Sequence, residues 1–281
     1  MKGPKEAALR VSSQEKKKMG LKELLLRLKE TPLFGKRPSE TKAPALTGVE
    51  QLDLIDRSQL SIFFEKDPLV ALYEVAMDRT QAPADSFFKR CRFFSLAELC
   101  EFALSKNEPG DIVECGCWRG HSAYMISTLA SKYGFRGAFH IFDSFEGLSE
   151  LSEEDRSQRF NLNTQEVAEQ AKWFACPEDI VKANLSGFPF VKTYKGWVPD
   201  RFAEVADKRF SFVHIDLDLY KPIMDSIHFF YPRMVKGGII VFDDYGSARF
   251  PGAKVAIDEA INKYSPTFFF RHPTGGAFLI V

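Results

Sequence analysis

The sequence lacks several features that would assign it to a class at once. No apolar stretch reaches the length of a membrane span, and the lysine-rich N-terminus has no apolar core of the kind found in signal peptides. The formal net charge is zero, so nothing global favours a nucleic-acid partner. We therefore expect a cytoplasmic protein that has no membrane span and binds no nucleic acid.

Cysteine is also scarce. The chain has five cysteines, an odd number without a disulfide pattern, which is typical of a reducing compartment. Cys115 and Cys117 have no second Cys or His pair at zinc spacing, so we interpret them as buried thiols. Hydrophobic residues, in contrast, make up 45% of the chain and include 27 Phe. This composition predicts one large globular domain with an extension.

The first hundred residues differ from the rest in pattern. Residues 1–45 hold 12 Lys+Arg against 5 Asp+Glu, which indicates a basic leader. Its leucines at helical spacing, Leu21, Leu24, Leu25 and Leu28, predict one amphipathic helix. We expect this helix to dock on its own domain or a sister subunit; a membrane-surface or anionic partner is the alternative. Residues 46–106 predict a helical cap or oligomerisation segment, with helices at 68–77 and 93–104, and a homodimer is compatible with this pattern.

From residue 107 onward, strands and helices alternate. The expected strands are 111–114, 138–143, 190–194, 212–216 and 239–243, and the expected helices are 121–133, 177–185, 223–235 and 253–264. A hairpin, 267–271 with 277–281, ends the chain. Residues 144–176 are polar and predict a lid that contains a helix. The pattern indicates an α/β fold with a doubly wound, mostly parallel sheet, an antiparallel C-terminal hairpin and an N-terminal helical extension.

Two of the expected strands end abruptly in aspartate. Asp216 follows the run Phe212–Ile215, and Asp243 and Asp244 follow Ile239–Phe242. Parallel strands present their carboxyl ends at one edge of the sheet, where these carboxylates would repel one another unless a cation compensates them. Oxygen ligands suit a hard divalent ion such as Mg²⁺. A single aspartate usually caps a helix or turn, but two strand-end clusters favour a metal site.

The expected first strand leads into a turn that suits a nucleoside cofactor. Gly116 and Gly120 let the backbone approach a ligand, and Asp143 ends the next strand, where it can accept hydrogen bonds from ribose hydroxyls. The Gly-x-Gly-x-x-Gly fingerprint is absent, which counts against NAD without excluding it and favours S-adenosylmethionine. We assign the cofactor contacts to Gly116, Gly120, Ser122, Asp143, Ser144 and Glu114. Glu114 either meets the cofactor's amino group or binds a helix cap.

These motifs together resemble one enzyme family. The segments Asp111–Gly120, Phe142–Leu148, His214–Tyr220 and Asp243–Gly246, with Tyr231–Gly238 between the clusters, are similar to the macrocin O-methyltransferase (TylF-type) family. The resemblance covers about residue 90 to the end. It implies a seven-stranded class I methyltransferase fold, S-adenosylmethionine and Mg²⁺, with Asp216, Asp243 and Asp244 as metal ligands and Asp218 as the general base. The chain departs from the family pattern at residues 196–202, which puts the substrate in doubt.

The expected function is Mg²⁺-dependent transfer of a methyl group from S-adenosylmethionine to a small-molecule hydroxyl. The resemblance suggests a sugar of a glycosylated secondary metabolite as the acceptor. A glycan or a catechol-like ring is the alternative acceptor. A catalytically silent scaffold that binds S-adenosylmethionine is the alternative function, although a scaffold has little reason to keep a costly acidic cluster.

Overall fold

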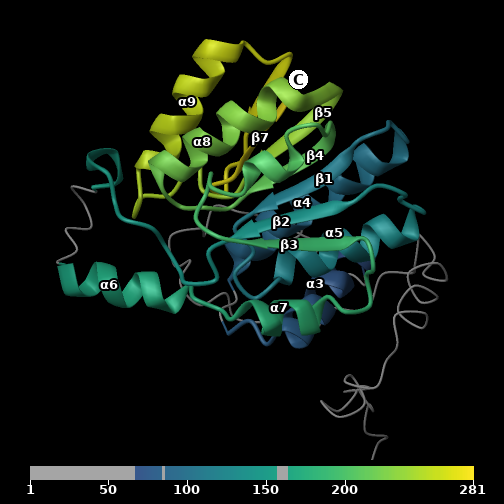
Figure 1. Cartoon of the computed structure of the whole chain (residues 1–281), viewed down its shortest axis with the longest axis horizontal. Helices are drawn as coiled ribbons and strands as arrows, with labels where there is room; N and C mark the ends of the chain where they lie inside the picture. Colours follow the sequence, from purple (N-terminus) through teal and green to yellow (C-terminus); the bar gives the residue numbers. More distant parts are fainter. Residues whose placement is uncertain (1–66, 84–85, 157–163) are drawn as a thin grey trace, which may run out of the picture.

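The structure of the chain is a computed structural model that describes residues 67–83, 86–156 and 164–281. The helix predicted within residues 1–45, and the start of the predicted helical cap, lie outside the described residues. The described part of the chain is built around one sheet covered by helices on both faces (Figure 1). Among the described residues, no helix is long and apolar enough to cross a membrane.

The sheet has seven strands in the order β3-β2-β1-β4-β5-β7-β6. Strands β1 to β5 pair in parallel, β7 runs antiparallel to β5, and β6 runs antiparallel to β7. The strand bounds are β1 Asp111–Cys115, β2 Phe139–Asp143, β3 Val191–Lys195, β4 Phe210–Ile215, β5 Met234–Phe242, β6 Phe268–Arg271 and β7 Ala277–Ile280. This arrangement confirms the predicted doubly wound sheet with its antiparallel hairpin.

Two apolar layers hold the helices to the sheet. One face packs against α3 (Pro68–Thr80), α4 (Phe87–Ser105), α5 (His121–Lys132) and α7 (Glu178–Asn184). The other face packs against α8 (Tyr220–Phe230) and α9 (Gly252–Tyr264). Every residue of β4 is buried, as expected for a central strand with helices on both sides. Helix α6 (Thr164–Trp173), in teal, lies apart from the sheet in Figure 1.

The main differences from the predicted elements are at helix ends. Helix α4 begins at Phe87, six residues before the predicted start, because the Oγ of Ser86 accepts a hydrogen bond from the N–H of Lys89 at 3.2 Å and caps it. Helix α8 ends at Phe230 instead of residue 235. Pro232 lies in the short 3₁₀ turn Tyr231–Arg233, and strand β5 then begins at Met234. The corrected bounds matter because α4 contributes to the site.

Candidate active site

The candidate site lies where the strand order reverses, between β1 and β4. From β1, the chain adds β2 and β3 on one side and β4 and β5 on the other, which opens a crevice at the carboxyl ends of the central strands. Gly116 follows β1 at φ +83°, and a Cβ atom there would lie 1.8 Å from the carbonyl oxygen of Asp216. The glycine is required because the turn after β1 packs directly on the end of β4.

The crevice holds a cavity of about 270 Å³ that combines both predicted halves of the site. Its walls include the turn after β1, the end of β2, the ends of β4 and β5, and helix α4. The lining side chains that bear on the argument are Lys89, Arg92, Trp118, Ser122, Asp143, Ser144, Trp173, Phe174, Asp216, Asp218, Asp243 and Asp244. One cavity of ligand size therefore lies between the turn and the aspartates.

Asp143 is the main polar anchor of the turn. Its Oδ2 accepts hydrogen bonds from the backbone N–H groups of Cys117 at 2.7 Å and Trp118 at 3.2 Å. Its Oδ1 accepts from the N–H of Phe145 at 2.7 Å. The carboxylate thus ties the turn after β1 to the end of β2, and it also lines the cavity. Asp143 shapes the predicted cofactor site in addition to any contact with the cofactor.

We predict that Asp143→Ala weakens the binding of S-adenosylmethionine by about 2–4 kcal/mol, because charge-assisted hydrogen bonds to the turn and to the ribose are lost together. Isothermal titration calorimetry measures this change. Asp111→Ala is the matched control: Asp111 also accepts a backbone hydrogen bond, from Ala138, but it lies at the opposite end of the parallel strands. An unchanged dissociation constant in the Asp143 variant would remove Asp143 from the cofactor site.

The other predicted cofactor residues divide into two groups. Gly116, Ser122 and Ser144 line the cavity. Gly120 is the N-cap of α5, at φ +83°, and is not part of the cavity wall. Glu114 is fully buried within the sheet, where its Oε1 lies 2.9 Å from Nδ1 of the equally buried His214. Glu114 is not part of the cavity wall, and its carboxylate links β1 to β4; its predicted contact with the cofactor stays a prediction.

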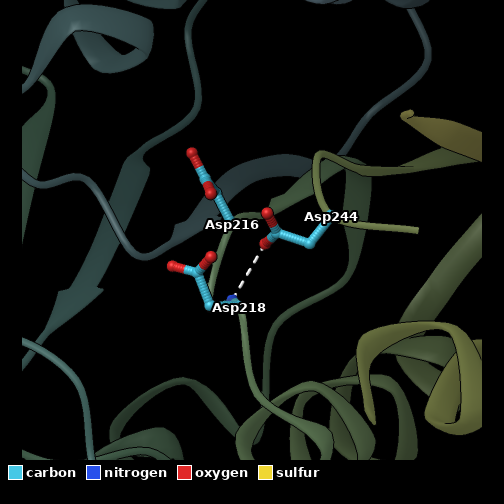
Figure 2. A group of neighbouring side chains, drawn as sticks. All are labelled: Asp216, Asp218 and Asp244. Carbon is cyan, nitrogen blue, oxygen red and sulfur yellow. Dashed lines mark hydrogen bonds between the residues drawn. The ribbon is translucent and has the colours of Figure 1, made fainter. Parts of the chain in front are cut away.

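Three strand-end carboxylates converge at the other side of the cavity. Among the described residues, Asp216, Asp218 and Asp244 form the group of possible metal ligands, with one oxygen of each within 4.8 Å of the others. Figure 2 shows these side chains at the ends of β4 and β5, where Oδ2 of Asp244 accepts a hydrogen bond from the backbone N–H of Asp218 at 2.9 Å. Asp218 has a positive φ of 61°, an unusual conformation for a residue other than glycine.

Asp243, which the sequence groups with Asp216 and Asp244, faces a different partner. Its Oδ1 accepts a hydrogen bond from Nε of Arg92 at 2.9 Å, and the two side chains form a largely shielded ion pair. Arg92 lies on α4 and was missed in the sequence analysis, because the predicted helix began one residue after it. Helical spacing from Phe93 and Leu96, which are both buried, would have placed Arg92 near the buried face of a longer helix.

The electrostatics of this acidic edge favour a cation. Burial, together with the charges of Asp243 and Asp244, holds the pKa of Asp216 well above its usual range. Burial and the charge of Asp244 do the same to the pKa of Asp218. The pKa of Asp244 is raised to about 6 by burial and by Asp243. The carboxylates thus repel one another despite the positive charge of Arg92 and, at Asp218, of Arg249, and their hard oxygen atoms fit a divalent ion such as Mg²⁺.

The raised pKa of Asp244 predicts that the stability of the metal-free protein depends on pH. The folded-state pKa of about 6 exceeds the ordinary value near 4, so the folded state loses stability as pH rises through this interval. Asp244→Asn removes this ionisation. In EDTA, we expect the variant and the parent to have the same free energy of unfolding near pH 4. At pH 7, the free energy of unfolding of the variant should be higher by about 2–3 kcal/mol. Thermal melts between pH 4 and 8 test this, and a pH-independent difference would contradict it.

Aromatic side chains form the remaining wall of the cavity. The rings of Trp118 and Trp173 lie 4.7 Å apart between centroids, and Phe174 packs edge-on against both. Nζ of Lys89 lies 5.5 Å from the centroid of the Trp118 ring. Val198, at one of the positions where the sequence departs from the family pattern, also lines the cavity. The cavity therefore has an apolar, aromatic part of its wall in addition to the acidic edge.

The sequence and the fold can now be compared with known proteins. A family model described as macrocin-O-methyltransferase (TylF) matches residues 57–264. The chain belongs to this family. Membership in the TylF family makes it an S-adenosylmethionine-dependent O-methyltransferase, and it confirms the resemblance drawn from the motifs.

Two curated relatives illustrate the similarity of this TylF-family chain to sugar methyltransferases. The 8-demethyl-8-(2,3-dimethoxy-alpha-L-rhamnosyl)-tetracenomycin-C 4'-O-methyltransferase of Streptomyces olivaceus is 27% identical over 202 residues, which cover 66% of this chain and 75% of the relative. The mycinamicin III 3''-O-methyltransferase of Micromonospora griseorubida is 26% identical over 217 residues, which cover 71% of this chain and 84% of the relative. Both relatives are named for methylating a hydroxyl of a complex metabolite.

A solved structure supports the fold. The O-methyltransferase NovP superposes with a TM-score of 0.57 at 24% sequence identity, covering 66% of this chain and 77% of that chain. At this level of identity the likeness establishes the architecture. It confirms the class I methyltransferase fold predicted from the strand pattern.

Proposed function

We propose that this TylF-family enzyme transfers the methyl group of S-adenosylmethionine to a sugar hydroxyl of a small glycosylated metabolite, with Mg²⁺ bound at the acidic edge. The observation that carries the proposal is the single cavity lined by the Asp143 turn on one side and the strand-end aspartates on the other. The sugar acceptor is supported by the Streptomyces olivaceus relative, whose name includes a rhamnosyl group. The repulsion that remains among the carboxylates supports the divalent ion.

The chain's own residues would share the work as follows. The turn after β1 and the carboxylate of Asp143 would bind the cofactor, which supplies an electrophilic methyl sulfonium when bound. Asp216, Asp243 and Asp244 would hold Mg²⁺, which supplies Lewis-acid polarisation of a nearby hydroxyl when bound. Asp243 fits this role because Arg92 contacts its Oδ1, which leaves Oδ2 for a ligand.

Asp218 would act as the general base. Its carboxylate lies beside those of Asp216 and Asp244, within reach of a hydroxyl placed at the acidic edge. Its raised pKa makes it a stronger proton acceptor than an exposed aspartate. Holding the hydroxyl in line with the methyl group would provide much of the remaining acceleration. Trp118, Trp173 and Phe174 would shield the reacting groups from water.

The experiment that tests this function is a methyl-transfer screen. Purified protein, radiolabelled S-adenosylmethionine and Mg²⁺ or EDTA are incubated with rhamnosides, other deoxysugar glycosides and catechols. Transfer to a glycoside in Mg²⁺ supports the proposal. Transfer to a catechol with no transfer to any glycoside would reject the sugar acceptor, and failure to bind S-adenosylmethionine in calorimetry would reject the cofactor.

A further inference from the structure

Arg92 brings the N-terminal helical segment into the active site. Its Nε donates to Oδ1 of Asp243, and its Nη1 donates to the backbone carbonyl of Thr274 at 3.4 Å. Its side chain is 24% exposed and that of Asp243 is 10% exposed, so water screens the pair weakly. The contacts join α4, the end of β5 and the turn of the C-terminal hairpin. One guanidinium therefore fixes three separate parts of the chain around one carboxylate.

The charge of Arg92 acts on the whole acidic edge. Arg92 lines the same cavity as Asp216, Asp218, Asp243 and Asp244, so its positive charge lies near all four carboxylates. A guanidinium stays protonated in proteins, and the carboxylate of Asp243 beside it favours the charged form. A permanent positive charge thus lies among carboxylates that would otherwise repel one another.

We propose that Arg92 is the resident counter-cation of the acidic edge: it holds Asp243 in place and compensates the carboxylates until the divalent ion binds. The proposal rests on the proposed function, because it assumes that the aspartates bind Mg²⁺. Arg92 is in this sense a positioning residue that acts through Asp243. If Arg92 has this role, the metal-free enzyme keeps the geometry of its metal site and is more stable than it would be without the charge of Arg92.

The chemistry of arginine suits this role better than that of lysine. The guanidinium is planar, and it donates from Nε to a side chain and from Nη1 to a backbone carbonyl at the same time. Its aliphatic stem packs beside Gly276, where a Cβ atom would lie 3.5 Å from Cδ of Arg92. Methionine can keep much of this apolar packing while it removes the charge. Arg92→Met therefore tests the charge, and Arg92→Lys tests the need for the two-sided contact.

The experiment compares thermal melts of the full chain in EDTA and in saturating Mg²⁺. In EDTA, we expect Arg92→Met to lower the Tm by roughly 5–10 °C, because a shielded carboxylate loses its partner. In Mg²⁺, most of this loss should disappear, so that the ion raises the Tm of the variant more than that of the parent. Arg92→Lys should recover only part of the stability in EDTA. Arg90→Met is the matched control, because Arg90 lies on the same helix but pairs with Glu74 outside the cavity.

A second variant links the effect to Asp243. In an Asp243→Asn background, Arg92→Met should lower the Tm in EDTA much less than in the parent, because the pair is already broken. If Arg92→Met lowers the Tm equally in both backgrounds, or equally with and without Mg²⁺, Arg92 contributes only ordinary packing. Either result would overturn the proposal. If Mg²⁺ stabilises neither parent nor variant, the metal site of the proposed function fails, and the counter-cation role fails with it. An equal loss of Tm in either comparison rejects only the role of Arg92, because Mg²⁺ still stabilises the protein. Failure of the Arg92 proposal and failure of the metal site can therefore be told apart.

Discussion

Asp218→Asn should cut turnover by about 10²–10⁴ while Mg²⁺ and S-adenosylmethionine still bind, because it removes a general base and little else. Asparagine has nearly the same shape as aspartate, and the hydrogen bond from Asp218 to Asp244 uses the backbone N–H, which the substitution keeps. The measurement combines kcat with the acceptor found in the screen and calorimetric titration of Mg²⁺ and cofactor. Ionisation of Asp218 should also limit activity at low pH, and that limit should vanish in the variant.

The Mg²⁺ titration decides between two roles for Asp218. Its carboxylate lies close enough to Asp216 and Asp244 to ligate the same ion. If Asp218→Asn loses Mg²⁺ affinity as strongly as Asp243→Asn does, Asp218 is a ligand and the base lies elsewhere. Asp207→Asn provides the control, because Asp207 precedes β4 at the opposite end of the sheet and its side chain is 74% exposed.

Removal of the metal should abolish methyl transfer. We expect EDTA-treated enzyme to lose at least about 10³ of its rate and to regain it with Mg²⁺, since Lewis-acid polarisation contributes several kcal/mol. Asp243→Asn should have a similar effect on rate, and it should lose the Mg²⁺-dependent rise in Tm. Full activity after chelation, verified by elemental analysis of the treated protein, would show that the metal is not required.

The same substitution shows why contacts matter beyond charge counting. From the sequence, Asp243→Asn removes one of several repelling carboxylates, so the metal-free variant should melt at an equal or higher temperature. The ion pair with Arg92 reverses this expectation for Asp243, because its removal leaves a shielded guanidinium without its partner. Within residues 67–83, 86–156 and 164–281, Asp244 forms no ion pair, and it is the aspartate whose neutralisation should stabilise the metal-free protein.

Much of the fold follows from local patterns in the sequence. Strands β2, β4 and β5 end at an aspartate or one residue before it, so their C-terminal ends are predictable to within one residue. The placement of Asp143, Asp216, Asp243 and Asp244 at one edge follows from the parallel order of these strands. The five cysteines are free and buried, as the lack of metal spacing indicates.

The missed features depend on pairs that are remote in sequence. Arg92 and Asp243 are 151 residues apart, and Glu114 and His214 are 100 apart. Nothing in the local pattern around Glu114 distinguishes a carboxylate that faces a cofactor from one that faces a histidine on the next strand. The contact of Asp243 with Arg92 has the same origin, because it depends on a helix outside the alternating part of the chain.

The contact at Gly116 limits how such an enzyme can change. Because this glycine touches the backbone of Asp216, with no room for a Cβ atom, the position of the cofactor turn depends on the position of the acidic edge. A mutation that shifted the turn would also displace the strand-end aspartates. Neither part of the site can therefore be moved alone. Val198 lines the cavity without taking part in this contact. We therefore expect that substitutions at Val198 change which acceptor fits while the cofactor turn and the acidic edge keep their positions.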